Sequence, residues 1–396
     1  MSLAIPRGFR FAAVAAGIKY SDRLDLALAE APAGATAAAL FTSNLVKAAP
    51  LVADARNLNK SAGAMRAIVV NSGNANCANG KAGLKGCIQI CAALARALGA
   101  REAQIFPSST GVIGMPFPTG TILAALPKLV ASLASSPIAA EAFSRAIMTT
   151  DTRPKLAVAS FQAGKREVRL LGIAKGAGMI HPNMATMLAY VFTDAQASPR
   201  ELRAALARAA GQSFNCISID GDTSTNDTLA LLASGESGVA LKGDAQRQFQ
   251  AALDRVCGSM AEQIVADGEG VQHVVRLHIE QARSEAEAHR VGNTIATSML
   301  NKTAWAGADP NWGRILAAIG RSGIALDPNR IDILLGKQQL CRQGQARDFD
   351  ERSAHALMSQ PSYDVRVILG RGRARVTILT TDLTADYVRI NADYRS

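Results

Sequence analysis

The sequence predicts a mixed α/β protein, and three observations support this fold class. Short apolar segments bounded by turn residues, which are typical of strands, alternate with longer segments whose apolar residues recur at helical spacing. The composition, with 48% hydrophobic and 19% charged residues, is that of a globular protein. The length of 396 residues favours two domains or one large layered domain with a substantial interior.

The first half of the chain predicts strands, and then helices around two polar loops. Up to Pro50, short apolar segments alternate with turns, and "FAAVAAGI" (11–18) is one expected strand. Ala67–Val70 is an expected buried strand that enters an Asn- and Gly-rich loop, and Lys81–Leu98 has the spacing of a helix. The other expected segments are a loop of small residues, "FPSSTGVIG" (106–114), and two amphipathic helices, "ILAALPKLVASLA" (122–134) and "AEAFSRAIMTTDT" (140–152).

The second half gives sharper signals. An unbroken apolar run, Met187–Phe192, predicts a buried strand. Ser198 and Glu201 form a capping box with Pro199 at the first helical position, so a helix is expected to begin there. The other expected segments are a strand at "CISIDGD" (216–222), a helix at "TNDTLALLAS" (225–234) and a hairpin at "VRVILGRGRARVTIL" (365–379).

The positive charge does not by itself predict nucleic-acid binding. A formal charge of +11 and a pI near 9.6 would suit phosphate binding. However, the one dense cluster, Arg371, Arg373 and Arg375, lies between two apolar segments and is favoured as the turn of the hairpin. An anion or nucleic-acid patch is the alternative interpretation of the same cluster.

The cysteines and the N-terminus indicate a reduced, cytoplasmic protein. None of the six cysteines forms a CxxC pair or has a histidine at metal-ligand spacing, so we expect no metal site. Residues 11–18 could imitate a signal peptide, but no convincing cleavage site follows them. No apolar run approaches the roughly 18 residues that a membrane span needs.

Several familiar motifs are absent, and one partial match fails. The sequence has no GxSxG, Walker A, HExxH or GxGxxG motif. "DGDTSTND" (220–227) begins like a calcium loop, but Thr225 stands where Gly is needed and Leu231 where Glu is needed. We therefore expect no calcium there.

The stretch "HPNMATM" (181–187) raises a different possibility, because Thr186 directly precedes the apolar run. A threonine hydroxyl becomes a useful nucleophile when its own N-terminal amine acts as the base, and this requires cleavage of the Ala185–Thr186 bond. The small residues of "KGAGMIHPNMA", including Gly176 and Gly178, would let the backbone bend for self-cleavage. On pattern alone, however, an ordinary strand-start residue is favoured.

A family resemblance changes this balance. "GIAKGAGMIHPNMATMLAY" (172–190) resembles the self-cleavage segment of the ornithine acetyltransferases, also called glutamate N-acetyltransferases, of arginine biosynthesis. The resemblance covers nearly the whole chain in the family's order. Further matching segments are "GFRFAAVAAGIK", "FTSNLVKAAP", "NSGNAN", "SSTGVIG", "TTDTRPK", "SFNCISIDGDTSTND", "DGEG", "GADPNWGRILAAIG" and "DYVRINADYRS".

The resemblance assigns a role to each matching residue. Thr186 is implied to be the nucleophile, and Thr110 and Gly111 the pair that stabilises the oxyanion. His181 precedes Pro182 and is expected to shape the loop or polarise the scissile carbonyl, not to act as a base. The implied substrate-binding residues are Thr149 or Thr150, Lys175, Glu269, Asn391 and Ser396. Without the resemblance, Lys175 and Glu269 would each be taken as solvated surface charges.

The resemblance also implies the architecture and the reaction. It implies layered sheets with flanking helices and a smaller C-terminal α/β portion. The α fragment (1–185) and the β fragment (186–396) are implied to share one core and to assemble as a heterotetramer of two α and two β chains. The implied reaction moves acetyl from N2-acetylornithine to L-glutamate, without a metal or organic cofactor.

Alternatives and departures remain at this stage. A self-processed amidohydrolase or aminopeptidase would pass the acyl group to water, and a basic nucleic-acid binder would stay uncleaved. No Gly-rich phosphate loop is present, so acetyl-CoA is expected to be a poor donor, although some family members use it. Gln272 and His273 replace a usual Thr-Lys pair, and Trp305-Ala306 a usual Ile-Phe pair, which bears on donor choice and substrate preference.

Overall fold

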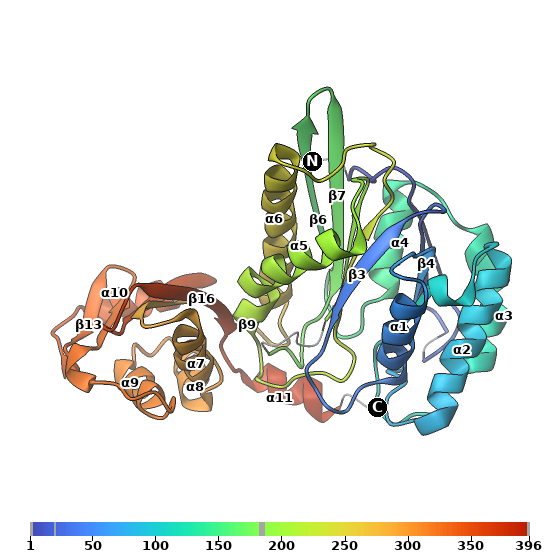
Figure 1. Cartoon of the computed structure of the whole chain (residues 1–396). Coiled ribbons are helices and arrows are strands. Elements are labelled where there is room, and N and C mark those ends of the chain that lie inside the picture. The colour runs from blue at the N-terminus through green and yellow to red at the C-terminus, as the bar shows by residue number, and fades with distance from the viewer. Residues whose placement is uncertain (1–2, 20, 182–186, 394–396) are drawn as a thin grey trace. The chain divides into compact units, whose positions relative to one another are not determined.

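The described residues fold around three β-sheets with flanking helices, which confirms the predicted mixed α/β class (Figure 1). The computed structural model describes residues 3–19, 21–181 and 187–393. It contains two compact units. The first comprises residues 1–176, 183–214 and 223–264, and the second comprises residues 177–182, 215–222 and 265–396.

The first unit holds a four-stranded and a five-stranded sheet. The four-stranded sheet has the order β1 (Arg10–Val14), β2 (Leu26–Glu30), β4 (Ala67–Asn71), β5 (Ile105–Ser109). The five-stranded sheet has the order β3 (Thr36–Phe41), β10 (Thr228–Ala233), β8 (Leu188–Thr193), β7 (Arg166–Lys175), β6 (Lys155–Ala163). Its central strands β8 and β10 are parallel, whereas β3 and β7 run antiparallel to them.

Helices pack against both sheets of this unit. The helices of this unit are α1 (Ala49–Lys60), α2 (Gly80–Ala97), α3 (Thr119–Ala131), α4 (Pro137–Ala146), α5 (Pro199–Gln212) and α6 (Asp244–Ala266), with 3-10 turns at Glu102–Gln104 and Phe214–Cys216. Helices α2 and α3 pack on the four-stranded sheet, while α5 and α6 lie against the five-stranded one. The unit is therefore layered as helix, sheet, sheet, helix.

The core between the two sheets explains the unbroken apolar run of β8. Tyr190 and Phe192 point into it and meet Phe11 and Phe143 edge to face, with the Phe11 and Phe192 ring centroids 5.0 Å apart. All six residues of β8 are buried because the layers cover both faces of the strand. Both the predicted strand and the α5 helix that begins at Pro199 after its capping box are confirmed.

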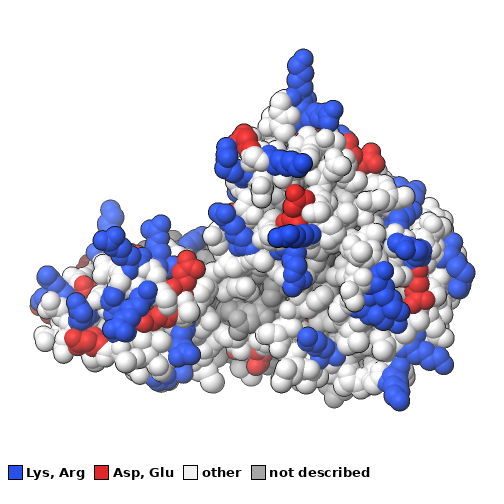
Figure 2. Space-filling model, in the orientation of Figure 1, with Lys and Arg blue, Asp and Glu red and all other residues white. Residues whose placement is uncertain are grey.

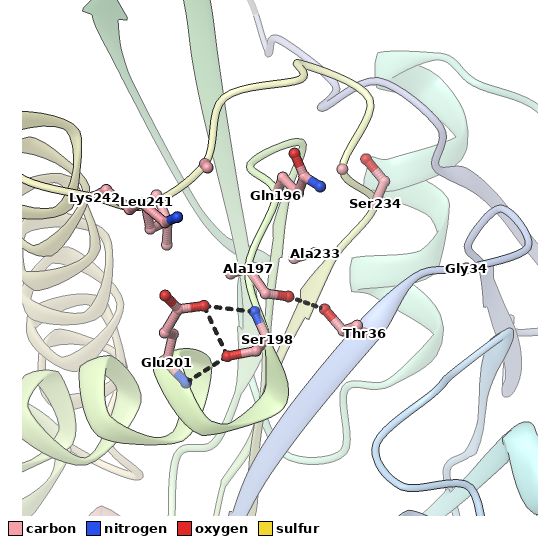
Figure 3. A pocket seen from close by; sticks show the side chains of 12 residues that line it. Gly34, Thr36, Gln196, Ala197, Ser198, Glu201, Ala233, Ser234, Leu241 and Lys242 are labelled. Carbon is pink, nitrogen blue, oxygen red and sulfur yellow. Dashed lines mark hydrogen bonds between the residues drawn. The ribbon is translucent and has the colours of Figure 1, made fainter.

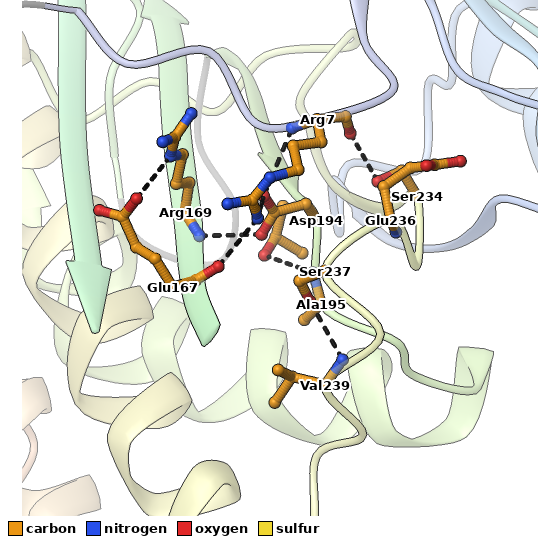
Figure 4. A network of polar contacts seen from close by, with 10 residues as sticks. Arg7, Glu167, Arg169, Asp194, Ala195, Ser234, Glu236, Ser237 and Val239 are labelled. Carbon is orange, nitrogen blue, oxygen red and sulfur yellow. Dashed lines mark hydrogen bonds and ion pairs between the residues drawn. The ribbon is translucent and has the colours of Figure 1, made fainter. Parts of the chain in front are cut away.

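An ion pair between a partly exposed arginine and a buried carboxylate holds the N-terminal segment at the far end of β8 (Figure 4). The Arg7 guanidinium lies 2.8 Å from the Asp194 carboxylate, whose side chain has no exposed surface. The same carboxylate accepts the Arg169 amide at 2.9 Å, and the Ser234 hydroxyl donates to the Arg7 carbonyl at 2.7 Å. Residues from both sides of the predicted cleavage point are thus joined here.

The second unit is built on a seven-stranded sheet. Its order is β14 (Gln345–Ala346), β13 (Gln338–Arg342), β12 (Asp332–Leu335), β15 (Ser362–Ile368), β11 (Val274–Ala282), β16 (Ala374–Thr381), β9 (Ile217–Ser218). Its helices are α7 (Glu285–Ala296), α8 (Met299–Ala306), α9 (Trp312–Gly320), α10 (Glu351–Met358) and α11 (Ala385–Ala392), with a 3-10 turn at Pro328–Arg330. The expected strand at 216–222 is reduced to the two residues of β9.

Three local predictions need correction. The helix expected at 225–234 is wrong, because Thr228–Ala233 is strand β10. A short apolar run buried on both faces has no period that separates it from a helix. The loop expected at 106–114 is also partly strand, since β5 extends to Ser109. The hairpin at 365–379 is wrong because β15 and β16 do not pair with each other but lie on either side of β11.

The arginine cluster beside these strands is partly used inside the fold. Arg371 binds the Glu287 carboxylate at 2.8 Å, and both side chains are only 10% exposed. Figure 2 shows Lys and Arg side chains dispersed over the visible face and interspersed with Asp and Glu. Among the described residues, no helix combines the length and apolar character that crossing a membrane requires.

Candidate active site

The start of strand β8 is fixed by a buried carboxylate. The Met187 amide donates to Asp227 Oδ1 at 2.9 Å, and the Met187 carbonyl accepts the Thr228 amide at 3.0 Å. Asp227 directly precedes β10, whose Thr228 is in register with Leu188. The residue that follows Thr186 in the chain is therefore anchored in the core of the first unit.

Three predicted site residues fall outside the described ranges. Ala185 and Thr186, the two sides of the predicted cleavage point, are among them, and so is Ser396. Their roles stay predictions.

Thr110 and Gly111 form a tight turn at the end of β5. The Thr110 amide donates to the Asn71 carbonyl at 2.9 Å. Gly111 has φ +131°, and a Cβ there would lie 2.3 Å from the Gly73 carbonyl carbon, so only glycine fits. Among the described residues, neither the Gly111 N–H nor the Thr110 hydroxyl donates to an acceptor. The Thr110 amide is thus engaged, and these two groups are the available donors of the pair.

Asn226 ties this turn to the start of β8, and sequence reasoning missed it. Its side-chain amide donates to the Ser109 carbonyl at 2.8 Å and to the Ala75 carbonyl at 2.7 Å. Asn226 is adjacent to Asp227, which holds Met187. The Thr110–Gly111 turn and the residue after Thr186 are therefore attached to two adjacent residues of "STND", to which the sequence had assigned no role in the site.

Lys175 belongs to a buried charged cluster. Its ammonium is 4.0 Å from Asp151 Oδ2, and its side chain is 5% exposed. Asp151 also binds Lys155 Nζ at 2.6 Å and accepts the amides of Gly176 at 2.6 Å and Thr149 at 3.0 Å. The surface-charge alternative for Lys175 is therefore wrong. The carboxylate of Asp151 joins two predicted substrate-binding residues, Thr149 and Lys175, whereas Thr150 is half-buried beside them.

The pKa values of Asp151 and Asp227 are shifted in opposite directions. Burial alone would raise the pKa of Asp151, but the charges of Lys175 and Lys155 and the Gly176 hydrogen bond lower it to about 2. Burial raises the pKa of Asp227 well above its usual range, against the Met187 hydrogen bond and the Lys175 charge. The neighbouring charges thus favour the ionised form of Asp151, whereas burial disfavours the ionised form of Asp227.

In the second unit, Glu269 and Asn391 bind each other. The Asn391 side-chain amide donates to Glu269 Oε2 at 2.7 Å, and the Glu269 amide donates to the Ala177 carbonyl at 2.8 Å. A Cβ on Gly178 would lie 2.4 Å from Glu269 Oε2. Gly176 has a φ of +150°, so it is needed for its backbone conformation, as expected. Gly178 is instead needed because a side chain there would collide with the Glu269 carboxylate.

His181 is held by a hydroxyl and not by an acid. Its Nδ1 lies 3.1 Å from Ser218 Oγ, and burial lowers the pKa of the imidazole although Asp222 raises it. The preceding residue, Ile180, is fully buried and donates its amide to Asp220. This geometry suits a residue that shapes the loop.

The two departures from the family pattern have different structural settings. Gln272 and His273 donate their backbone amides to Asp382, at 3.1 and 3.2 Å, so this contact does not depend on their side chains. Trp305 is 2% exposed and packs in the core of the second unit. The Trp305 change is therefore accommodated by packing.

The described residues offer no group of three or more His, Cys, Asp or Glu side chains that could hold a metal ion. The Asp220 and Asp227 carboxylates of the calcium-like stretch bind backbone amides instead. All six cysteines are buried and unpaired with one another.

A cavity of about 380 Å³ lies at the other end of β8 from Met187 (Figure 3). Several of its polar groups already serve the fold. Ser198 and Glu201 form the cap of α5, and the Thr36 hydroxyl donates to the Ala197 carbonyl at 2.6 Å. None of the predicted site residues within the described ranges lines this cavity.

Comparison with known proteins identifies the family. Residues 10–396 match the ArgJ family. The chain belongs to the ArgJ family. The predicted membership is thereby confirmed, and the chain is an acetyltransferase of arginine biosynthesis.

Relatives of known name and structure share most of this ArgJ sequence. The "Arginine biosynthesis bifunctional protein ArgJ" of Methylococcus capsulatus is 48% identical over 394 residues, which are 98% of this chain and 95% of that protein. The protein of the same name from Geobacter sulfurreducens is 43% identical, over 98% of this chain and 99% of that protein. A crystal structure of ArgJ from Bacillus halodurans is 38% identical, with a TM-score of 0.50, and covers 51% of this chain and 97% of that chain.

Proposed function

We propose that this protein cleaves itself between Ala185 and Thr186 and uses the new N-terminal threonine to transfer acetyl from N2-acetylornithine to L-glutamate. The observation that carries the proposal is the anchoring of Met187 by Asp227, next to Asn226, which holds the Thr110–Gly111 turn. A nucleophile one residue before Met187 would start from a rigid strand, which is how positioned groups lower a barrier.

The chemistry follows from the free amine. The Thr186 hydroxyl attacks the Ala185 carbonyl, and hydrolysis of the resulting ester leaves Ala185 with a carboxylate and Thr186 with an amine. An α-amine with an ordinary pKa of about 7.7 to 8.0 can take the hydroxyl proton near neutral pH. The hydroxyl then attacks the acetyl carbonyl, ornithine leaves, and the amine of glutamate attacks the acetyl-Thr186 ester. The Gly111 N–H and the Thr110 hydroxyl suit the developing oxyanion.

The charged candidates match the two amino-acid substrates. A buried ammonium such as Lys175 suits an α-carboxylate, and the Glu269 carboxylate, bound by Asn391, suits an ammonium or incoming amine. Thr149 or Thr150 and Ser396 complete the proposed set. Both half-reactions handle a free or acetylated amino acid, so one set of groups can serve them.

The proposed fragments, 1–185 and 186–396, would stay together because each supplies strands to the five-stranded sheet. Strands β3, β6 and β7 come from the α fragment, and β8 and β10 from the β fragment. The Bacillus halodurans chain matches half of this chain along nearly its whole length. This is the length expected of one separated fragment. We propose a cytoplasmic heterotetramer of two α and two β chains, to be tested by native mass spectrometry.

Mass spectrometry of the purified protein tests the self-cleavage. Two fragments of about 19 and about 22 kDa are expected, by scaling 41.4 kDa with length. Thr186→Ala should stay one chain and be inactive, and Thr186→Ser should keep cleaving because it retains a hydroxyl. An intact wild-type chain with full activity would refute the mechanism.

Kinetics test the transfer. Supplying N2-acetylornithine alone should add one acetyl group to the Thr186 fragment, and initial-rate plots at several glutamate levels should be parallel. Intersecting lines would contradict the covalent intermediate. Release of free acetate at the same rate with and without glutamate would favour the amidohydrolase alternative.

The donor range needs a separate assay. We propose that N2-acetylornithine is the main donor, whereas the relatives' name "bifunctional protein" suggests a second reaction for them. The assay compares kcat/KM for acetyl-CoA and N2-acetylornithine with glutamate as acceptor. A difference below about tenfold, or about 1.4 kcal/mol in transition-state stabilisation, would contradict a recycling-only enzyme.

A further inference from the structure

The segment that leads to the proposed cleavage point, residues 177–181, is bound residue by residue within the second unit. The Ala177 carbonyl accepts the Glu269 amide at 2.8 Å, and the Ile180 carbonyl accepts the Ile219 amide at 2.8 Å. Gly178 packs on the Glu269 carboxylate, and His181 lies beside Ser218. Each residue of this segment is therefore bound by a neighbouring part of the second unit, although the segment is not a strand.

Asp220 supplies the central contacts of this arrangement. Its Oδ1 accepts the amides of Ile180 at 2.9 Å and Asp222 at 3.2 Å, while its Oδ2 accepts the Met179 amide and the Tyr387 hydroxyl, the latter at 3.3 Å. A carboxylate offers about four acceptor positions, so this one is fully used. Asp220 is thus built to hold backbone and has no acceptor position left for proton transfer.

The backbone at Met179 needs such support. Its φ of +57° is a left-handed conformation, which is unfavourable for a residue that is not glycine and persists only where the surroundings enforce it. Asp220 binds this amide and the next one, so the two contacts together fix the bend. The chain continues from this bend to the proposed cleavage point.

Asp220 also connects this bend to the C-terminal helix. Tyr387 and Asn391 lie one turn apart on α11, where Asn391 binds Glu269 and Tyr387 binds Asp220. The residues on both sides of the bend, Gly178 and Ile180, are therefore held against groups that α11 stabilises.

We infer that Asp220 is a positioning residue for self-cleavage, which it supports by fixing the Met179–Ile180 bend and by linking that bend to α11 through Tyr387. This inference rests on the proposed function. Cleavage requires the Ala185 carbonyl to meet the Thr186 hydroxyl in a strained geometry, and misplacement by about 1 Å can cost about a hundredfold in rate.

The test follows cleavage of newly synthesised full-length chains with time, as the ratio of precursor to fragments. Asp220→Asn presents an N–H₂ group where one of the amides was bound, and it should slow cleavage by about tenfold or more because charge-assisted contacts are lost. Asp222→Asn is the matched control. It removes the same charge from the same loop, but the Asp222 carboxylate accepts no hydrogen bond among the described residues. It should cleave within about twofold of wild type.

A second variant separates positioning from folding. Tyr387→Phe removes one hydroxyl and should slow cleavage by about threefold while leaving the thermal midpoint nearly unchanged, because a neutral hydrogen bond is worth little net stability. Cleavage of Asp220→Asn at the wild-type rate would overturn the inference. If Asp220→Asn does not fold, a wild-type rate for Tyr387→Phe would overturn it instead. Wild-type protein that stays whole would refute the proposed function itself, whatever Asp220 does.

Discussion

Gly111→Ala offers a direct test of the proposed oxyanion turn. The added Cβ would lie 2.3 Å from the Gly73 carbonyl carbon and 2.5 Å from the Asn74 nitrogen, both of which are backbone atoms. Ordinary contact begins at 3.4 Å, so the two turns must separate by about 1.1 Å. The backbone at φ +131° cannot absorb this shift, because that region excludes side chains.

A displacement of this size is large compared with the tolerance of an oxyanion contact. The donors must lie about 2.7 to 3.1 Å from the oxygen, and loss of one donor typically lowers kcat by about 10² to 10³. We therefore expect kcat to fall by at least about a hundredfold, which is about 2.7 kcal/mol in the barrier. KM should change less, because the turn acts on the transition state.

Gly114→Ala is the matched control in the same loop. Gly114 also has a positive φ, +82°, but a Cβ there meets nothing within 4 Å. Both variants incur backbone strain of about 1 to 3 kcal/mol, so their difference isolates the steric displacement. The assay measures kcat per mole of Thr186 N-terminus, counted by mass spectrometry. A kcat for Gly111→Ala within threefold of Gly114→Ala would refute the role of this turn.

Three further predictions concern buried charges. Asp227→Asn should cleave nearly as fast as wild type, because burial raises the pKa of Asp227 and the amide oxygen can still accept the Met187 N–H. Asp227→Ala should cleave about tenfold more slowly, because that acceptor is lost. Equal cleavage rates for these two variants, measured by mass spectrometry, would contradict this reasoning. The folded pKa of Asp151, about 2, lies below its unfolded value of about 3.9, so about 2 kcal/mol of stability should be present above pH 4 and lost toward pH 2. Thermal midpoints of Asp151→Asn and wild type should then converge on acidification, and a constant gap would refute the assignment. Arg7→Ala should cost about 2 kcal/mol in urea unfolding, because it removes the counter-charge of the buried Asp194 carboxylate. Arg10→Ala should cost less, because Arg66 still pairs with Glu30, and equal losses would contradict this reasoning.

The sequence predicted elements best where the signal was local. The capping box at Ser198 located α5, and the apolar run after Thr186 located β8. The prediction failed at Thr228–Ala233, because a strand buried on both faces carries no alternation. It failed again at β15 and β16, where the tight turn encouraged a local pairing. The strand that separates them, β11, comes from about 90 residues earlier, and no local pattern encodes that insertion.

The candidate site was likewise predictable only in part. The resemblance supplied five of the described site residues. Thr110, Gly111 and Lys175 lie in the first unit, and Glu269 and Asn391 lie in the second. The carboxylates that organise these groups, namely Asp151, Asp220 and Asp227, were missed because each binds backbone amides distant in sequence. Their signal was a polar run next to a buried strand, which is also what an ordinary loop looks like.

The strand order of the five-stranded sheet constrains when the chain can be cut. Strands β8 and β10 lie between β3 and β7, so the later part of the chain must be inserted between two strands of the earlier part. While the peptide bond is intact, the two parts are at high effective concentration, and the insertion is an intramolecular search. Cut beforehand, the same step becomes an encounter of two chains with exposed strand edges, which favours aggregation. The proposed self-cleavage would avoid this hazard if it required the finished fold, because the tether would then be lost only after it is no longer needed. A gene divided at codon 186 would lose that protection.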